Sequence, residues 1–312
     1  MNGIHLFLFI IYLIMDCPDL QEKPERDLIP RIERLIGAKV LSCKPVQGGY
    51  TPATRLICQT AMASFFVKAG TTSLTCTALR REASVYSQVH GPFMPDLIAW
   101  EDDEPVSILV LEDLSKAEWP PPWTARQIDL VLEQIDALHK LTGLLEPYAH
   151  VHGARLPGWR TVANDPEPFL HLGFVDMTWL ERALPALLEY EARCKTDGDN
   201  LTHWDIRSDN LCITENRVVF VDWNLACLSN PELDLGFWLP SLAYEGGPQP
   251  EQIIPDAPEI AAWVSGFFAA RAGLHDIPDA PRVRLVQRQQ LETALPWVIR
   301  TLHLPPAKLP RI

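Results

Sequence analysis

One short segment limits the folds open to this chain more than any other feature. It reads HWDIRSDN and carries His203, Asp205 and Asn210 in the spacing H-x-D-x-x-x-x-N. An apolar run over residues 218–221 follows and ends on Asp222, which predicts a short strand with a carboxylate at its end. The fold therefore has to bring a polar loop and a strand end close together.

These side chains suit magnesium-dependent phosphoryl transfer, which depends on positioning and charge neutralisation. Asp205 is suited to orient an attacking hydroxyl and accept its proton, and the fork of donors on Arg207 is suited to phosphate. Asn210 and Asp222 offer the oxygen ligands that Mg²⁺ prefers. Taken singly, each residue has an ordinary explanation in a turn or a helix cap. Their order along the chain carries the prediction.

The first third of the chain has the pattern of a small mixed lobe. Short apolar runs bounded by turn residues indicate strands, and apolar residues at helical spacing indicate one helix. The expected elements are a hairpin around Gly48 and Gly49, a strand over 64–67 that ends on Lys68, a helix over 78–89 and a strand over 108–111. We place this strand-rich lobe at residues 27–113.

Residues 114–312 are expected to form a second, mostly helical lobe. Thr124 is a predicted N-cap, and Gln127 occupies the capping-box position three residues later. Further helices are predicted over residues 177–194, 260–270 and 283–302.

Composition excludes several classes of function. The 312 residues carry a formal net charge of −13, which argues against nucleic acid as a partner because backbone phosphates require a basic surface. The seven cysteines are scattered and form no C-x-x-C pair, so neither a zinc site nor a disulfide framework is expected. Reduced thiols of this kind favour the cytoplasm.

Residues 1–26 form an apolar leader of uncertain status. The run over residues 4–15 is too short to span a bilayer and has the length of a signal-peptide core or a buried helix. No basic residue precedes it, and Asp16-Cys17-Pro18 is a poor cleavage site, so neither secretion nor a membrane anchor is predicted. A natural start at Met15 is an alternative.

The order of these features resembles the protein-kinase-like fold, and specifically the aminoglycoside phosphotransferase and choline kinase branch. Val221-Asp222-Trp223 is similar to the I/V-D-W/F/Y motif of that branch, where a protein kinase has D-F-G, and NPELDL over residues 230–235 resembles its P-x-x-D-L segment. Nothing reads as A-P-E. The resemblance extends from about residue 32 to the C-terminus. It implies an α+β, bilobal fold with a small antiparallel-sheet N-lobe that binds nucleotide and a larger, mostly helical C-lobe for catalysis and substrate binding.

The resemblance also implies roles for individual residues. Asp205 would be the catalytic base, His203 would support its loop, and Asn210 and Asp222 would bind Mg²⁺. On the nucleotide side, Lys68 would hold the phosphates of ATP or GTP, Glu82 would orient it, Gly48 and Gly49 would cover the nucleotide, and Glu112 would lie at the hinge that reads the base. The ordinary alternatives are a solvated strand end for Lys68, an exposed helix face for Glu82 and a tight turn for the glycines.

Trp204 and Asp234 each have two interpretations, and Trp204 also departs from the family pattern. The family commonly has glycine where this chain has Trp204, and that indole is expected either in the core or in the wall of the substrate pocket. Asp234 is expected either to brace the catalytic loop or to cap a helix.

The predicted function is transfer of a γ-phosphoryl group from ATP or GTP to a hydroxyl of a small molecule. The net charge, with Glu232, Asp234 and Glu245 near the expected cleft, favours a cationic acceptor such as an aminoglycoside or an amino alcohol. Two alternatives are a pseudokinase module that binds nucleotide without turnover, against which the retained polar residues count, and a protein kinase, against which the absence of D-F-G counts. The oligomeric state is left open.

Overall fold

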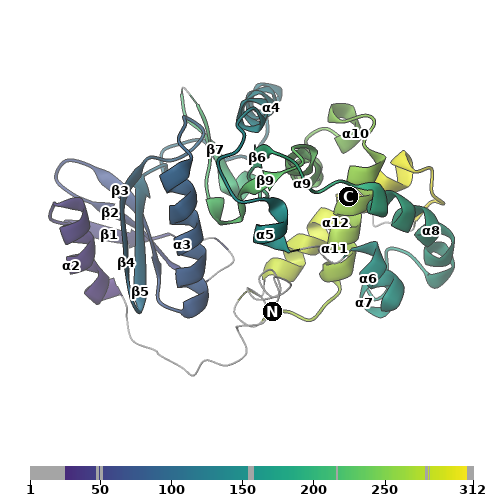
Figure 1. Ribbon diagram of the computed structural model, residues 1–312, viewed down its shortest axis with the longest axis horizontal. Coiled ribbons are helices and arrows are strands. Elements are labelled where there is room, and N and C mark those ends of the chain that lie inside the picture. Colours follow the sequence, from purple (N-terminus) through teal and green to yellow (C-terminus); the bar gives the residue numbers. More distant parts are fainter. Residues whose placement is uncertain are drawn as a thin grey trace.

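The computed structural model describes residues 25–46, 49, 52–153, 158–215, 217–277, 280 and 282–307, so residues 1–24 of the predicted leader lie outside the described residues. The amino-terminal lobe is a five-stranded antiparallel sheet in the order β1-β2-β3-β5-β4, with one helix on each face (Figure 1). The strands are β1 (Ser42–Pro45), β2 (Thr54–Gln59), β3 (Ser64–Gly70), β4 (Leu97–Asp103) and β5 (Val106–Glu112), and the helices are α2 (Glu25–Ile36) and α3 (Ser73–Gln88).

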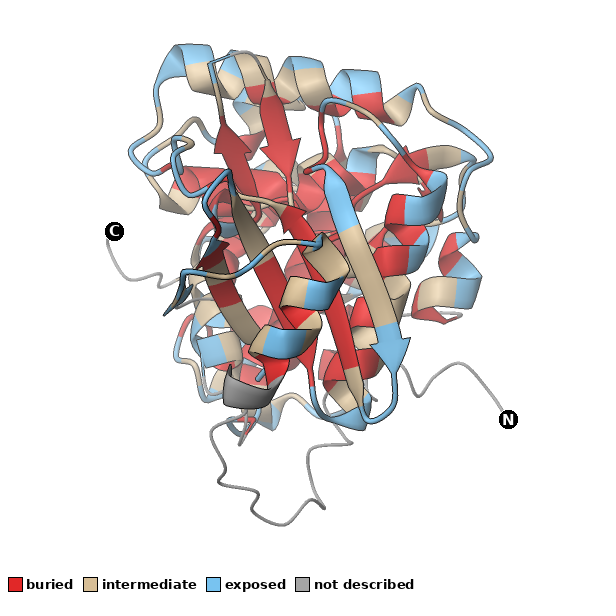
Figure 2. Cartoon of the chain, turned by 90° about the vertical axis from the view of Figure 1, so that its left-hand side faces the viewer, coloured by how far each residue is buried: buried red, intermediate tan, exposed pale blue. Residues whose placement is uncertain are grey.

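Alternation of side chains along the central strands gives each face of the sheet its own core. Val67 of β3 lies in one apolar cluster with Ile32 of α2, whereas Leu109 of β5 lies in another with Leu79 of α3. The central strands are buried, and the ends of β4 are exposed (Figure 2). The same alternation turns Lys68, next to Val67 in β3, toward α3.

The predicted glycine hairpin is confirmed by the pairing of β1 with β2, from Ser42 opposite Gln59 to Pro45 opposite Leu56. Gly48 lies outside the described residues. Gly49 is exposed and has φ +73°, in the left-handed region that glycine enters without steric cost.

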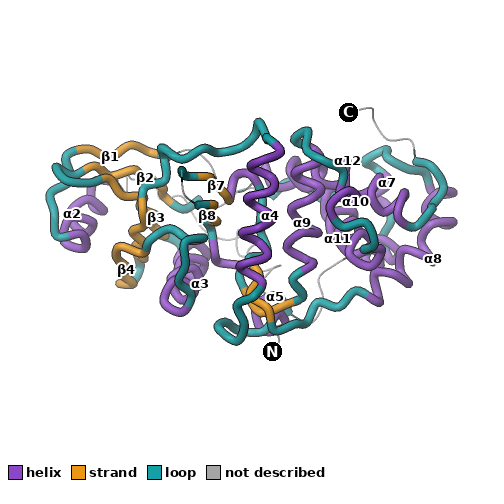
Figure 3. Tube along the Cα trace, turned by 90° about the horizontal axis from the view of Figure 1, so that it is seen from above, coloured by secondary structure: helices purple, strands orange, loops and turns teal. Residues whose placement is uncertain are grey.

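The second lobe is mostly helical, so the predicted fold class is confirmed. Its helices gather at one end of the molecule, and the main sheet lies at the other (Figure 3). Its helices are α4 (Ala125–His139), α5 (Tyr148–His152), α6 (Trp159–Asn164), α7 (Glu167–Leu170), α8 (Met177–Arg193), α9 (Glu232–Tyr244), α10 (Pro250–Ile253), α11 (Pro258–Ala272) and α12 (Arg282–Thr301). Between α8 and α9 lie the strands β6 (Asn200–Thr202), β7 (Leu211–Ile213), β8 (Val218–Phe220) and β9 (Cys227–Ser229), and the 3₁₀ turns η2 (Ser208–Asn210) and η3 (Trp223–Leu225).

Helix α11 is the centre of this lobe. All of its residues from Ile260 to Ala272 are buried, and α6, α8, α9 and α12 pack around it. A helix that is apolar on every side needs neighbours on every side. The two short sheets, β6 with β9 and β7 with β8, lie between this helical body and the N-lobe, where they carry the loops of the site (Figure 1).

The helices predicted from the sequence are confirmed, with shifts of one or two residues at most of their ends. The helix predicted over residues 78–89 is α3, which begins five residues earlier, at Ser73. Thr124 and Gln127 form the expected capping box at the start of α4. The predictions for residues 177–194, 260–270 and 283–302 correspond to α8, α11 and α12. Within the part of the chain that the structure describes, no helix has both the length and the apolar character needed to cross a membrane.

Candidate active site

The loop after β6 is held by one buried carboxylate. Asp234, in the first turn of α9, is fully buried and accepts hydrogen bonds from the backbone N–H groups of His203 (2.9 Å) and Trp204 (2.7 Å). His139 of α4 lies 3.0 Å from the same carboxylate. Asp234 therefore braces the loop that carries Asp205, as the first of its two expected roles requires.

His203 supports the loop as a neutral imidazole. Its Nε2 lies 3.0 Å from the carbonyl oxygen of Val221, and its Nδ1 lies 3.3 Å from the backbone nitrogen of Asp205. The ring is fully buried, and this burial lowers its pKa to about 4. The neutral ring thus donates to Val221, between β8 and Asp222, and accepts from the loop that carries Asp205.

Lys68 of the N-lobe contacts a carboxylate from each lobe, Glu82 and Asp222. Its Nζ lies 2.8 and 2.9 Å from the two carboxylate oxygens of Glu82 in α3 and 3.0 Å from Oδ1 of Asp222. Glu82 and Lys68 are buried, at 1% and 7% exposure. Burial by itself lowers the pKa of Lys68, but the charges of Asp222 and Glu82 outweigh it and raise the pKa, whereas Lys68 holds the pKa of Asp222 below its usual range. The structure therefore contains the expected contact between Lys68 and Glu82.

Asp222 itself sits in an uncommon backbone conformation. Its φ of 69° and ψ of 56° lie in the left-handed region, which Asp and Asn tolerate better than other non-glycine residues. The backbone turns sharply there from β8 into η3 and does not continue the strand. The carboxylate of Asp222 consequently faces Lys68.

Asp205 has close polar neighbours on its own loop. Nδ2 of Asn210 donates to Oδ2 of Asp205 (2.8 Å), and Nε of Arg207 lies 3.4 Å from Oδ1. Arg207 also contacts Asp209, at 3.1 Å. Burial raises the pKa of Asp205 to about 7, with Asp209 and Asp222 adding to that rise and Arg207 and Asn210 opposing it.

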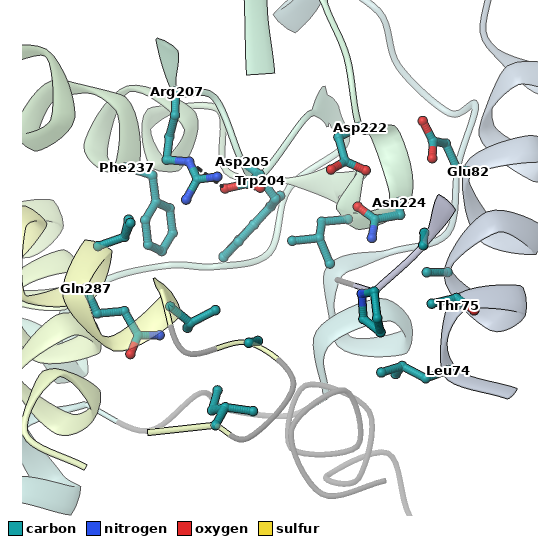
Figure 4. Close-up of a pocket in the computed structure, with 18 of the residues that line it drawn as sticks. Leu74, Thr75, Glu82, Trp204, Asp205, Arg207, Asp222, Asn224, Phe237 and Gln287 are labelled. Atoms are coloured by element: carbon teal, nitrogen blue, oxygen red, sulfur yellow. Dashed lines mark ion pairs between the residues drawn. The ribbon is translucent and has the colours of Figure 1, made fainter. Parts of the chain in front are cut away.

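These groups border one cavity of about 240 Å³ between the two lobes. Asp205 lies between Arg207 and Phe237 on one side and Asp222 and Glu82 on the other (Figure 4). The charged end of the cavity is formed by Lys68, Glu82, Asp205 and Asp222. The apolar end is formed by Trp204, Phe237, Phe267, Phe268, Val283 and Val286, with Gln287 and Gln290.

The donor set fits a magnesium ion held partly by substrate. The amide of Asn210 donates through nitrogen to Asp205, which leaves its carbonyl oxygen as a ligand, and Asp222 retains a second carboxylate oxygen beside the one that Lys68 contacts. The backbone N–H of Val221 donates to the backbone carbonyl oxygen of Asn210 (2.9 Å), so the segments that carry Asn210 and Asp222 are adjacent. Among the described residues no group of three His, Cys, Asp or Glu side chains forms a complete protein cage. Mg²⁺ commonly keeps one or two protein ligands and takes the rest from phosphates and water.

The structure does not bring Glu112 to this cavity. Its backbone N–H donates to the carbonyl oxygen of Asp96 (2.9 Å), and its carboxylate pairs with Arg217. The predicted hinge role of Glu112 stays a prediction, as do the covering roles of Gly48 and Gly49. Gly49 lies instead beside a neighbouring hollow that Arg207 also borders.

Sequence reasoning missed most of the apolar end. The sequence predicts Trp204 either in the core or in the wall of a pocket, and it occupies both positions. It is 5% exposed within the core of the C-lobe and also lines the cavity. Phe237, Phe267 and Gln290 come from three different helices and belong to no motif. The available signal is the all-apolar character of α11, which indicates a buried helix but not which side faces a cavity.

Comparisons with known proteins agree with this geometry. The family model described as the phosphotransferase enzyme family matches residues 42–286. The solved structure of the aminoglycoside phosphotransferase APH(4)-Ia has a TM-score of 0.58 at 16% identity, covering 89% of this chain and 97% of that one. Spectinomycin phosphotransferase APH(9)-Ia has a TM-score of 0.57 at 14% identity, with coverage of 89% and 98%. A Haemophilus somnus protein described as a fructosamine-3-kinase has a TM-score of 0.51 at 10% identity, with coverage of 86% and 96%.

At these identities the solved structures establish the fold alone, and no curated protein matches the chain. The family match is independent of them, covers well over half of the sequence and includes every polar residue of the charged end. The chain therefore belongs to the phosphotransferase enzyme family and is a small-molecule kinase.

Proposed function

We propose that this enzyme transfers the γ-phosphoryl group of ATP or GTP to a hydroxyl of a small molecule, with Mg²⁺ as cofactor. The observation that carries the proposal is the buried contact of Lys68 with both Glu82 and Asp222, beside Asp205 and in the same cavity. Two solved relatives are described as complexes with a nucleotide and an aminoglycoside-type acceptor, one with AMP-PNP and hygromycin B and one with ADP and spectinomycin. Those ligands support a nucleotide donor for this chain.

Each residue of the charged end has a distinct task in that reaction. Lys68, held by Glu82, neutralises phosphate charge on the donor, and Asp205 orients the acceptor hydroxyl and accepts its proton. Arg207, 3.4 Å from Asp205, is placed to balance charge on the transferring group. Asn210 and Asp222 would hold Mg²⁺, which supplies charge neutralisation between donor phosphates when bound. His203 and Asp234 keep the loop in position and touch no substrate.

The test is an ADP- or GDP-release assay on the full chain with a panel of hydroxyl acceptors. We expect release to require magnesium and acceptor together, and we expect nucleotide binding without an acceptor. Failure of the chain to bind either Mg-ATP or Mg-GTP would overturn the proposal. Tight nucleotide binding, with no phosphorylated product from any class of acceptor, would favour the pseudokinase alternative. The acceptor classes to include are aminoglycosides, amino alcohols, sugars and uncharged apolar alcohols.

A further inference from the structure

The walls of the apolar end carry no formal charge. The six side chains that form it are aromatic or aliphatic, and its two polar members, Gln287 and Gln290, are amides. The charged residues that line the cavity are Arg55, Lys68, Glu82, Asp205, Arg207 and Asp222. The carboxylates among them already contact cations or donors of the protein, because Glu82 and Asp222 contact Lys68 and Asp205 contacts Arg207 and Asn210. All the carboxylates of the described lining therefore lie at the charged end, and none borders the apolar end.

The acidic residues that suggested a cationic acceptor lie elsewhere or have other partners. Asp234 is fully buried and binds the backbone of the catalytic loop. Glu245 accepts hydrogen bonds from Ser208 and from the indole of Trp123 (2.7 Å). Glu232 is exposed in the first turn of α9 and does not line the cavity. None of these three carboxylates therefore lines the cavity that holds Asp205.

The two amides offer one donor and one acceptor to a ligand. Nη1 of Arg284 donates to Oε1 of Gln287 (2.8 Å), which fixes the amide so that its NH₂ group is turned away from Arg284 and toward the cavity (Figure 4). Gln290 is 4% exposed, and its Oε1 has no hydrogen-bond partner among the described residues. A buried oxygen without a donor is costly, so a ligand that donates to it gains affinity.

Aromatic rings can also attract quaternary ammonium groups, but this cluster is not arranged for that purpose. The guanidinium of Arg271 already lies over the ring of Phe267, 3.7 Å from its centroid. Trp204 is packed among other rings, with centroid distances of 4.5 Å to His152 and 5.5 Å to Phe237, and its Nε1 donates to Ser229. Arg207 stands beside Phe237 at the border of the cavity (Figure 4), so a cation there would lie next to a guanidinium that is already paired with Asp205 and Asp209.

We propose that the acceptor is an uncharged hydroxyl compound with an apolar body, which packs against Trp204, Phe237 and Phe267, donates a hydrogen bond to Gln290 and presents its hydroxyl to Asp205. This inference rests on the proposed kinase function and names its substrate class. It replaces the expectation of a cationic acceptor.

A matched pair of acceptors isolates the charge. Choline and 3,3-dimethyl-1-butanol have the same shape and the same primary hydroxyl, but only choline carries a positive charge. With Mg-ATP or Mg-GTP, we expect kcat/KM for the neutral alcohol to exceed that for choline by about tenfold, since burying an ammonium without a carboxylate is unfavourable. Larger uncharged alcohols with aromatic or alicyclic bodies should bind more tightly, and aminoglycosides should be the poorest acceptors. For compounds that are not turned over, ligand-observed NMR gives the same comparison as a dissociation constant.

The Gln290→Leu variant tests the hydrogen bond separately. We expect the KM of a neutral acceptor that carries a second donor group to rise by about tenfold, with KM for nucleotide and unfolding temperature unchanged. Leu285→Ala is the matched control, because Leu285 is 55% exposed on the same helix and lies outside the cavity. Equal or better activity with choline or an aminoglycoside, or no binding of any neutral alcohol at millimolar concentration, would overturn the inference. Nucleotide binding is measured alongside, so a wrong acceptor class is distinguished from a wrong kinase assignment.

Discussion

The two ends of the cavity were built in opposite ways. At the charged end, Lys68 contacts two carboxylates and Asp205 contacts a cation and an amide donor, so the groups hold one another in position. At the apolar end, most side chains meet only through packing, and the Oε1 of Gln290 lacks a donor within the described structure. Under the proposed function, the charged end would hold the donor phosphates and the reacting hydroxyl, whereas the apolar end would hold the body of the acceptor.

The largest expected effect is at Asp205. Replacing its carboxylate in Asp205→Asn removes the proton acceptor and should lower kcat by about 10³-fold, while the dissociation constant for Mg-nucleotide stays within about twofold. In Asp222→Asn the affinity for Mg-nucleotide should fall by about tenfold or more, because the change alters both a proposed magnesium ligand and a partner of Lys68. Single-turnover kinetics and equilibrium nucleotide binding separate the two variants.

The control for both variants is Asp136→Asn, an exposed carboxylate on α4 that pairs with Lys140. It should behave as the wild type in both measurements. Full activity in Asp205→Asn would remove the assignment of the catalytic base, and loss of nucleotide affinity in that variant equal to the loss in Asp222→Asn would show that the two carboxylates do not have separate tasks.

The next effect concerns the buried contact between Lys68 and Glu82. Glu82→Gln leaves the buried ammonium with one carboxylate instead of two, and we expect it to lower the free energy of unfolding by about 2–3 kcal/mol and to raise KM for nucleotide. Urea unfolding and steady-state kinetics measure the two effects. Asp136→Asn, which breaks a pair that is exposed on both sides, should leave stability unchanged. Unaltered stability in Glu82→Gln would mean that Asp222 alone compensates the charge of Lys68.

The sequence predicts the charged end well, because most of that end is local. His203, Asp205 and Asn210 lie within eight residues, and Asp222 follows after the two short strands β7 and β8, so a motif specifies them before any tertiary packing is known. The family resemblance implies the pairing of Lys68 with Glu82, and the strand and the helix that carry them are consecutive along the chain.

The apolar end is not predictable in the same way. Trp204, Phe237 and Phe267 are about thirty residues apart, and apolar periodicity identifies core faces without showing which core residues also border a cavity. Glu112 marks a second limit. The family resemblance places it at the hinge, where backbone groups would read the base, and that role stays a prediction. The long-range ion pair of its side chain with Arg217 could not be predicted, because neither partner lies in a recognisable pattern.

A smaller effect is expected in the packing behind the apolar end. His152 is 3% exposed, its ring lies against Trp204, and burial lowers its pKa to about 4. In the unfolded chain His152 has a pKa near 6.5, so between pH 6.5 and 4 the unfolded state binds a proton that the folded state does not. The contribution of His152 to the free energy of unfolding is therefore fully present above pH 6.5 and falls as the pH drops from 6.5 to 4. In His152→Asn this part of the pH dependence should disappear, on the order of 2 kcal/mol across that interval.

The pH dependence is measured by urea unfolding at several pH values, with the slope of stability against pH as the readout. His150→Asn is the matched control, because His150 is exposed on the same helix α5 and pairs with Glu146. His203 also has a lowered pKa and contributes the same background slope to every variant. An unchanged slope in His152→Asn would show that His152 is not the titrating group.

The smallest expected effect is a difference in stability between two replacements of Trp204, which distinguishes the role of its backbone conformation from that of its side chain. Trp204 has φ 69°, in the left-handed region, where glycine is free of the strain that any other residue bears. Trp204→Gly and Trp204→Ala both remove the indole and should both raise KM for a neutral acceptor, but the glycine variant should be the more stable of the two by about 1 kcal/mol. At Trp238, buried within helix α9, the order should reverse, because glycine in a helix costs about 1 kcal/mol more than alanine. If the alanine variant were the more stable one at both sites, the loop would not be held in its left-handed turn by Asp234 once the indole is removed. The indole itself would then fix the wall of the apolar end.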